Sequence, residues 1–77
     1  MVNVTVHELT FVLDRPPTGE EQAALYEAGL SDSAIEVDNG TGYLHVDREA
    51  LTMDEAVSSV IADARRAGFD AQLVDGV

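Results

Sequence analysis

The stretch SAIEVDNGTGYLHVD, residues 33–47, predicts a β-hairpin that decides the fold. Its centre, Asn39-Gly40, is the dipeptide preferred in a type I′ turn, where both positions take positive φ. Counting outward from the turn pairs Val37 with Gly42, Glu36 with Tyr43, Ile35 with Leu44, and Ser33 with Val46. Because side chains alternate across a strand, this register separates apolar from polar residues. One face would carry Ile35, Val37, Leu44 and Val46, and the other Glu36, Asp38, Tyr43, His45 and Asp47.

A helix is predicted on each side of the hairpin by the same starting pattern. Residues 18–21 (TGEE) and 52–55 (TMDE) both place Glu three positions after Thr, which is a capping box. Each helix is expected to end at an Ala-Gly pair, residues 28–29 and 67–68, because glycine takes the left-handed closing conformation. The expected core residues are Ala24, Leu25 and Ala28 from the first helix, and Met53, Ala56, Val57, Val60, Ile61, Ala64 and Ala67 from the second.

Two further strands complete the pattern. In the first, about residues 2–13, the valines at 2, 4 and 6 alternate in one phase and the apolar residues at 9, 11 and 13 in the other. We therefore expect a bulge near residues 7–8. The last strand, about residues 69–74, places Phe69, Ala71 and Leu73 on one side. The element order predicts a single α+β domain over residues 1–77, a ferredoxin-like βαββαβ fold with a four-stranded antiparallel sheet and two helices on one face.

Charge limits the partners that this chain is expected to bind. It has 15 acidic residues, four arginines and no lysine, for a formal net charge of −11. Affinity for nucleic acid depends on basic contacts to phosphates, so direct binding to nucleic acid is not expected, nor is binding to an anionic membrane. No apolar run reaches the ~18–20 residues of a spanning helix. Residues 1–7 lack the pattern of a secretory leader, so we expect a cytoplasmic protein.

Residues that could carry catalysis or bind metal are sparse. There is no cysteine, so thiolate chemistry and disulfides are excluded. His45 and Asp47 share a strand face that His7 could approach, but their spacing matches no short zinc motif. The acids of the helix starts are explained by capping, and a two-layer domain of this size rarely encloses a pocket. We therefore expect no metal, no cofactor and no enzymatic activity.

The Asp47-Arg48-Glu49 corner, which precedes the second helix, admits two interpretations. It is either a recognition corner or a turn in which Arg48 pairs locally with acids. Surface ion pairs are commonly local, which favours the second interpretation.

Residues of about 24–68 resemble a group of short bacterial domains that, in longer relatives, precede a helix-turn-helix region. The shared segments are LYEAG at 25–29, an acid at Asp32, DREA at 47–50 and EAVSSVIAD at 55–63. The resemblance implies a small regulator or antitoxin-like protein. No helix-turn-helix or basic segment accompanies these residues. The resemblance therefore implies only contact with another protein or with a second copy of the chain.

Together, these features predict a non-enzymatic acidic module that engages a basic protein surface. A small regulator, an inhibitor or an antitoxin-like protein of bacterial or phage type would have this character, as would a mimic of nucleic-acid charge. Electrostatic complementarity speeds and sharpens such recognition. The candidate contact acids are Glu20, Glu21, Glu27, Asp54, Glu55 and Asp63. The alternative is that these acids only keep the protein soluble.

The alternative function uses the sheet face that the helices leave open. A second copy of the chain or a small ligand could cover this face, as in a dimeric sensor domain. Its expected residues are Thr10, Val12, Tyr43, His45, Gln72 and Val74.

Overall fold

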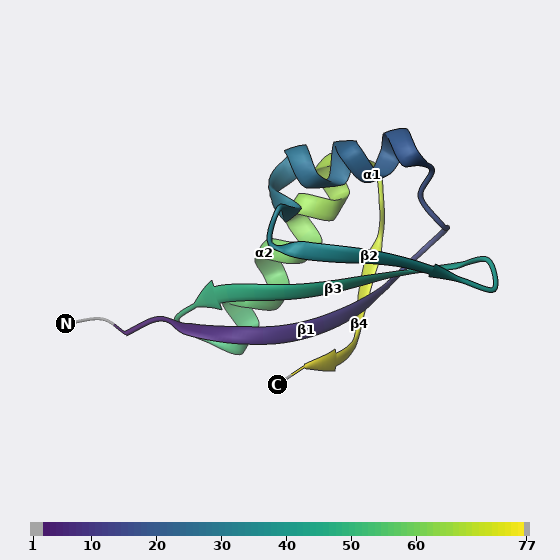
Figure 1. The fold of residues 1–77 in the computed structure, drawn as a ribbon. Helices are drawn as coiled ribbons and strands as arrows, with labels where there is room; N and C mark the ends of the chain where they lie inside the picture. Colours follow the sequence, from purple (N-terminus) through teal and green to yellow (C-terminus); the bar gives the residue numbers. More distant parts are fainter. Residues whose placement is uncertain (1–2, 77) are drawn as a thin grey trace.

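The computed structural model describes residues 3–76 and has an α+β architecture (Figure 1). Its elements are β1 (Thr5–Leu13), α1 (Gly19–Leu25), η1 (Tyr26–Leu30), β2 (Ser33–Asp38), β3 (Thr41–Ala50), α2 (Met53–Arg66) and β4 (Ala71–Gly76). η1 is a π-helical turn that continues α1. Val2, expected in the first strand, lies outside the described residues.

The four strands form one antiparallel sheet in the order β2-β3-β1-β4. β1 therefore lies between β3 and β4, while β2 and β4 form the two edges. The buried residues of the sheet, of α1, of η1 and of α2 belong to a single hydrophobic cluster. Both helical segments consequently cover the same face of the sheet (Figure 1). Among residues 3–76, no helix lies on the opposite face.

The hairpin has the predicted register. Ser33 pairs with Val46, Ile35 with Leu44, Glu36 with Tyr43, and Val37 with Gly42. Asn39 and Gly40 have φ of 51° and 76°, the positive values that a type I′ turn requires. The turn chemistry and the alternation of side chains thus agree, which explains why this register was predictable.

The bulge expected near residues 7–8 is wrong. β1 pairs with β3 without interruption from Thr5 to Val12. The irregularity lies in the pairing with β4, where Asp75 is opposite Thr10 but Leu73 is opposite Phe11. Val74 is the extra residue there. Because alternation in β1 is unbroken, Val4 and Val6 stay exposed, at 57% and 52%, rather than joining the core.

The two helix starts differ in detail. Thr18 forms the complete capping box with Glu21, whose backbone N–H donates to the Thr18 hydroxyl at 3.2 Å while its carboxylate accepts from the Thr18 N–H at 3.0 Å. At α2 the Thr52 hydroxyl accepts from the Glu55 N–H at 3.1 Å. The helical backbone of the first segment is interrupted at Gly29, as predicted: Gly29 has a φ of 125°, and the turn there buries Leu30. Ala24, expected in the core, is exposed.

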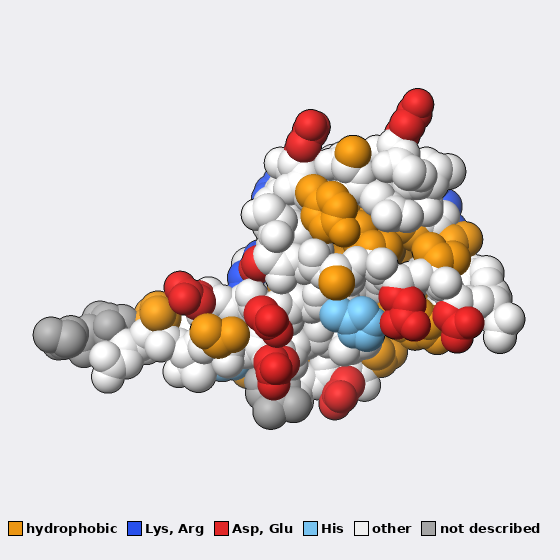
Figure 2. Space-filling view, in the orientation of Figure 1, with side chains coloured by type: hydrophobic (Ala, Val, Ile, Leu, Met, Phe, Trp, Pro, Cys, Tyr) orange, Lys and Arg blue, Asp and Glu red, His pale blue; other side chains and the backbone are white. Residues whose placement is uncertain are grey.

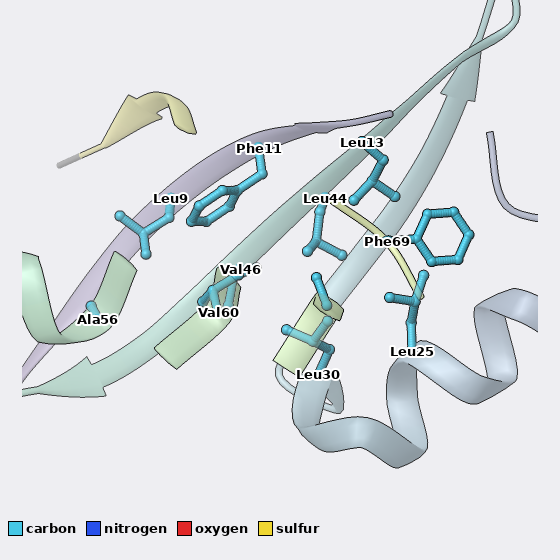
Figure 3. Packing of buried hydrophobic residues seen from close by; sticks show 11 residues of the cluster. Leu9, Phe11, Leu13, Leu25, Leu30, Leu44, Val46, Ala56, Val60 and Phe69 are labelled. Atoms are coloured by element: carbon cyan, nitrogen blue, oxygen red, sulfur yellow. The ribbon is translucent and has the colours of Figure 1, made fainter. Parts of the chain in front are cut away.

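The core lies between the sheet and the helices. Leu25 and Leu30 gather with Leu44 and Phe69 in one part of it (Figure 3). The helix α2 buries Ala56, Val60 and Ala64 as predicted. The other expected residues of this helix are partly buried against the cluster, namely Met53, Val57, Ile61 and Ala67.

Candidate functional site

The uncovered side of the sheet, which we call the open face, is defined by cross-strand pairing. Thr10 of β1 is opposite His45 of β3, and the alternation of both strands fixes which other residues share their side. The open face comprises Val6, Glu8, Thr10 and Val12 of β1, Tyr43, His45, Asp47 and Glu49 of β3, Ala34 and Glu36 of β2, and Gln72 and Asp75 of β4.

The open face is charged with a single sign. Glu8 lies directly opposite Asp47, and like charges at such a position repel. Glu49 pairs with Val6 in the same ladder, and Asp75 is opposite Thr10 on the other side of β1. Figure 2 shows acidic side chains spread around a histidine on the visible surface.

All four arginines lie elsewhere. Arg15 follows β1 in a loop, where it pairs with Glu21 at 2.9 Å and stacks over the Phe69 ring. Arg48 points to the covered side of the sheet, opposite His7. The remaining two arginines, 65 and 66, are in the last turn of α2. The arginines of this chain are therefore confined to the helical side, whereas acidic residues occur on both sides of the sheet.

His45 is the centre of a hydrogen-bonded chain across three strands. Its Nε2 lies 2.8 Å from Glu36 Oε1, and its Nδ1 lies 3.2 Å from Thr10 Oγ1. A carboxylate can only accept, so Nε2 carries the proton. This hydroxyl–imidazole–carboxylate order has the components of a nucleophile and its base. Both ring nitrogens of His45 are thus engaged, and their contacts join β1, β3 and β2 across the open face.

A shallow hollow of about 440 Å³ lies beside this chain of contacts. Its lining includes Glu8, Thr10, Ala34, His45 and Asp47. The small side chain of Ala34, opposite His45, leaves space at this position. The hollow is thus a part of the open face on which a partner's side chain could rest between carboxylates.

On the covered side of the sheet, Arg48 forms a second charged cluster. Unlike the carboxylates of the open face, the acids of this cluster are paired with a cation. The Arg48 guanidinium donates to both carboxylate oxygens of Asp32 at 2.9 Å and to Asp63 Oδ2 at 2.8 Å. It also donates to the Ser59 hydroxyl at 3.0 Å and to the Gly29 carbonyl at 2.9 Å. The hydrogen bonds to Asp32 are the main reason that the pKa of Arg48 is raised above its ordinary value. The arginine orders several segments, but its partners are distant in sequence rather than its neighbours in the corner.

The prediction that Asp63 faces solvent as a contact acid is wrong. Asp63 is 8% exposed and bonds with both Arg48 and Arg66. Gly29 makes this burial possible, because a Cβ at that position would lie 2.7 Å from Asp63 Oδ2. Asp63 is therefore a structural residue that ties α2 to β3 and η1.

The other acids predicted for partner contact do not form one surface. Glu20 and Glu21 begin α1, which follows the end of β1, whereas Asp54 and Glu55 begin α2, which follows the end of β3. Because β1 and β3 are antiparallel, these two helix starts lie at opposite ends of the sheet. Glu21 is also occupied by its capping box and by Arg15. Glu27 is exposed on η1.

The residues predicted for the open face are largely brought together. Thr10 is opposite His45, and Val12 is opposite both Tyr43 and Gln72. Val74 lies at the β4 irregularity and is exposed. Sequence reasoning missed Glu8, Glu49 and Asp75 as parts of the same surface. Unbroken alternation through β1 was the signal for Glu8, and it was obscured by the assumed bulge.

Within residues 3–76, no three His, Asp or Glu side chains are arranged to hold a metal ion. Neither helix in this range has the length and apolar character needed to cross a bilayer. No family model, curated protein or solved structure matches the chain. The resemblance of residues 24–68 to regulator domains therefore stays a prediction.

Proposed function

We propose that this protein is a non-enzymatic acidic binding module whose open face engages a basic surface of another protein. The observation that carries the proposal is that the open face carries carboxylates while all four arginines lie on the helical side. Carboxylates on the open face have no arginine beside them, whereas the arginines are paired or placed on the helical side.

Electrostatics explains why this arrangement suits a basic partner. Opposing carboxylates such as Glu8 and Asp47 raise the free energy of the unbound protein. A partner that supplies Lys or Arg removes this repulsion, and complementary potentials also accelerate encounter. The contact surface is thus assigned to the open face in place of the scattered helix-start acids.

A small regulator, inhibitor or antitoxin-like protein is the class of function that fits such a module. Where the partner itself binds nucleic acid, the carboxylates of the open face would stand in place of phosphates. The same negative surface opposes direct binding of nucleic acid. We also propose a ferredoxin-like arrangement as the finer description of the fold, and the placement of β1 between β3 and β4 supports it.

Self-association through the open face is the alternative, with a dimeric sensor or a small-ligand-binding domain as its functional form. The exposed valines 4 and 6 favour it, since apolar side chains gain from burial. Stacking two copies face to face would, however, bring the same carboxylates together. Sedimentation at increasing protein concentration decides this alternative, because it requires a dimer whose formation is promoted by salt.

The proposal is tested by capture from a cell lysate with two variants of equal charge. The first neutralises the open face (Glu8→Gln, Asp47→Asn, Glu49→Gln) and the second neutralises the helical side (Glu20→Gln, Glu27→Gln, Asp54→Asn). Retained proteins are identified by mass spectrometry at low and high salt. We expect a basic protein that the wild type and the helical-side variant retain at low salt and that the open-face variant loses.

Two results would overturn this proposal. If no basic protein is retained at low salt, the proposal of a basic protein partner is wrong. Equal loss in both variants would show that binding depends on net charge and not on the open face.

A further inference from the structure

We infer that the segment recognised by the open face is a basic amphipathic α-helix lying along β1. This inference rests on the proposed function and names the form of its partner. It follows from the backbone of the sheet, from the placement of apolar residues around the carboxylates and from the distribution of charge on both sides of β1.

The pairing of β1 favours a helix over an extended partner on the central part of this surface. From Leu9 to Val12, β1 has ladder partners on both sides, β3 and β4, so its backbone there is engaged within the sheet. An extended peptide laid there would leave its own backbone groups unpaired in the interface. A helix satisfies its backbone internally and is the element that commonly covers a sheet face.

Apolar residues lie at both ends of the acidic part of the face. Val6 lies near the start of β1, just after the exposed Val4, while Val12 and Tyr43 are paired near the other end of the strand. Between these ends lie the carboxylates of Glu8 and Asp47. Apolar side chains that flank a charged centre provide anchoring area in addition to charge. A purely hydrophilic basic loop would leave the valines uncovered.

Charge lies on both sides of the β1 axis. Asp47 and Glu49 are on β3, and Asp75 is on β4, on the opposite flank. A helix centred over β1 would therefore meet carboxylates along both of its edges. Its matching sequence has an apolar stripe with Lys or Arg on each side, which is the pattern of a basic amphipathic helix.

The length of the contact fixes the size of the probe. The distance along β1 from Val6 to Val12 is about 20 Å at the rise of a β-strand. A helix that spans it needs roughly 14 residues. The probe is a 14-residue Leu/Lys peptide with leucines at i, i+3, i+4 and i+7. One control peptide has the same composition in scrambled order, and a second carries a central proline that prevents helix formation.

The experiment measures affinity by fluorescence anisotropy at low salt and maps the contact by NMR amide shifts of the whole chain. We expect the amphipathic peptide to bind at least tenfold more tightly than either control. The largest shifts should fall on β1 and β3, around Glu8 and Asp47. Circular dichroism of the bound peptide should show helix.

A pair of protein variants tests the apolar contribution. Val6→Ser removes an exposed valine of the open face, and Val37→Ser removes one of similar exposure, 48%, on the other side of the sheet. Only Val6→Ser should lower the affinity for the amphipathic peptide, by a factor of about three to ten. Equal effects of the two substitutions would contradict the placement along β1.

The outcomes separate this inference from the proposed function. If the scrambled and proline peptides bind as tightly as the amphipathic one, with shifts on the same face, the helical partner is wrong but the basic partner stands. If no peptide shifts the open face, both fail. A salt-promoted dimer that buries the face would instead identify a second copy as its occupant.

Discussion

The Arg48 cluster and the open face differ in how their charged side chains are paired. The cluster pairs carboxylates with arginine, whereas the open face leaves carboxylates without a cation beside them. In the cluster, Arg48 and Asp63 are mostly removed from water, and every polar atom of their contact has a partner. On the open face, Glu8 and Asp47 are exposed and face each other without a cation between them. The same residue types therefore serve two purposes in this protein. Paired charges fix the fold, and unpaired charges are left available to a partner.

Breaking the paired cluster should give the largest effect. Asp63→Asn removes a buried carboxylate and leaves Arg48 with one fewer anionic partner, so we expect a loss of roughly 3 kcal/mol in the free energy of unfolding. Urea denaturation followed by circular dichroism measures it. Asp54→Asn, on the exposed first turn of the same helix, is the control and should cost less than about 1 kcal/mol. Similar losses for both would show that the cluster does not hold the fold.

The next largest loss of stability is expected at Gly29, which lies against the Asp63 carboxylate. Gly29→Ala combines a strained φ of 125° with a Cβ placed 2.7 Å from the Asp63 carboxylate, and should cost about 2 kcal/mol. Gly40→Ala also has positive φ, 76°, but open space around its Cβ, so its cost should be nearer 1 kcal/mol. The same urea series measures both. A larger loss at Gly40 than at Gly29 would contradict the steric account of the cluster.

These elements show how far the sequence could lead. The hairpin and both helix starts were predictable because local turn and capping patterns encode them in adjacent residues. The Arg48 cluster was not, because its members come from segments that only tertiary packing brings together. From the sequence alone, Asp63 is expected at a solvent-facing position of the helix. Only the structure shows that Gly29 lies against its carboxylate.

The open face was predictable in part. Alternation in the hairpin places Tyr43 and His45 on it correctly. The acids of the neighbouring strands were missed because their positions depend on which residues of β1 and β4 pair. A single misplaced bulge reverses the face of every residue beyond it. The charged surface therefore needed the structure, whereas the α+β class did not.

Acid titration should sharpen the distinction between paired and unpaired acids. Hydrogen bonding to the Thr18 N–H, together with Arg15, lowers the pKa of Glu21 below its ordinary value. Its contribution to stability is therefore present above about pH 4.3. It is lost as the pH falls through the lowered pKa of the folded state. In urea unfolding from pH 6 to pH 3, Glu21→Gln should be less stable than wild type at pH 6, and the gap should close toward pH 3. A gap that is constant with pH would contradict this assignment.

The smallest effect on stability concerns the open face itself. Glu8→Lys replaces a repulsive pair with an attractive one opposite Asp47, and should stabilise the protein by about 0.2–1 kcal/mol. Glu27→Lys is the control, since it makes the same change in net charge on exposed η1. Thermal unfolding at low salt should therefore rank Glu8→Lys above Glu27→Lys.

The most direct test of the account measures stability and binding together in these two variants. If the carboxylates of the open face serve a partner, Glu8→Lys raises the melting temperature above that of Glu27→Lys. Glu8→Lys also weakens binding of the basic amphipathic peptide, by a factor at least ten times larger than Glu27→Lys does. If Glu8→Lys is no more stable than Glu27→Lys and binds the peptide equally well, the open face is not a binding surface and its acids only contribute to net charge.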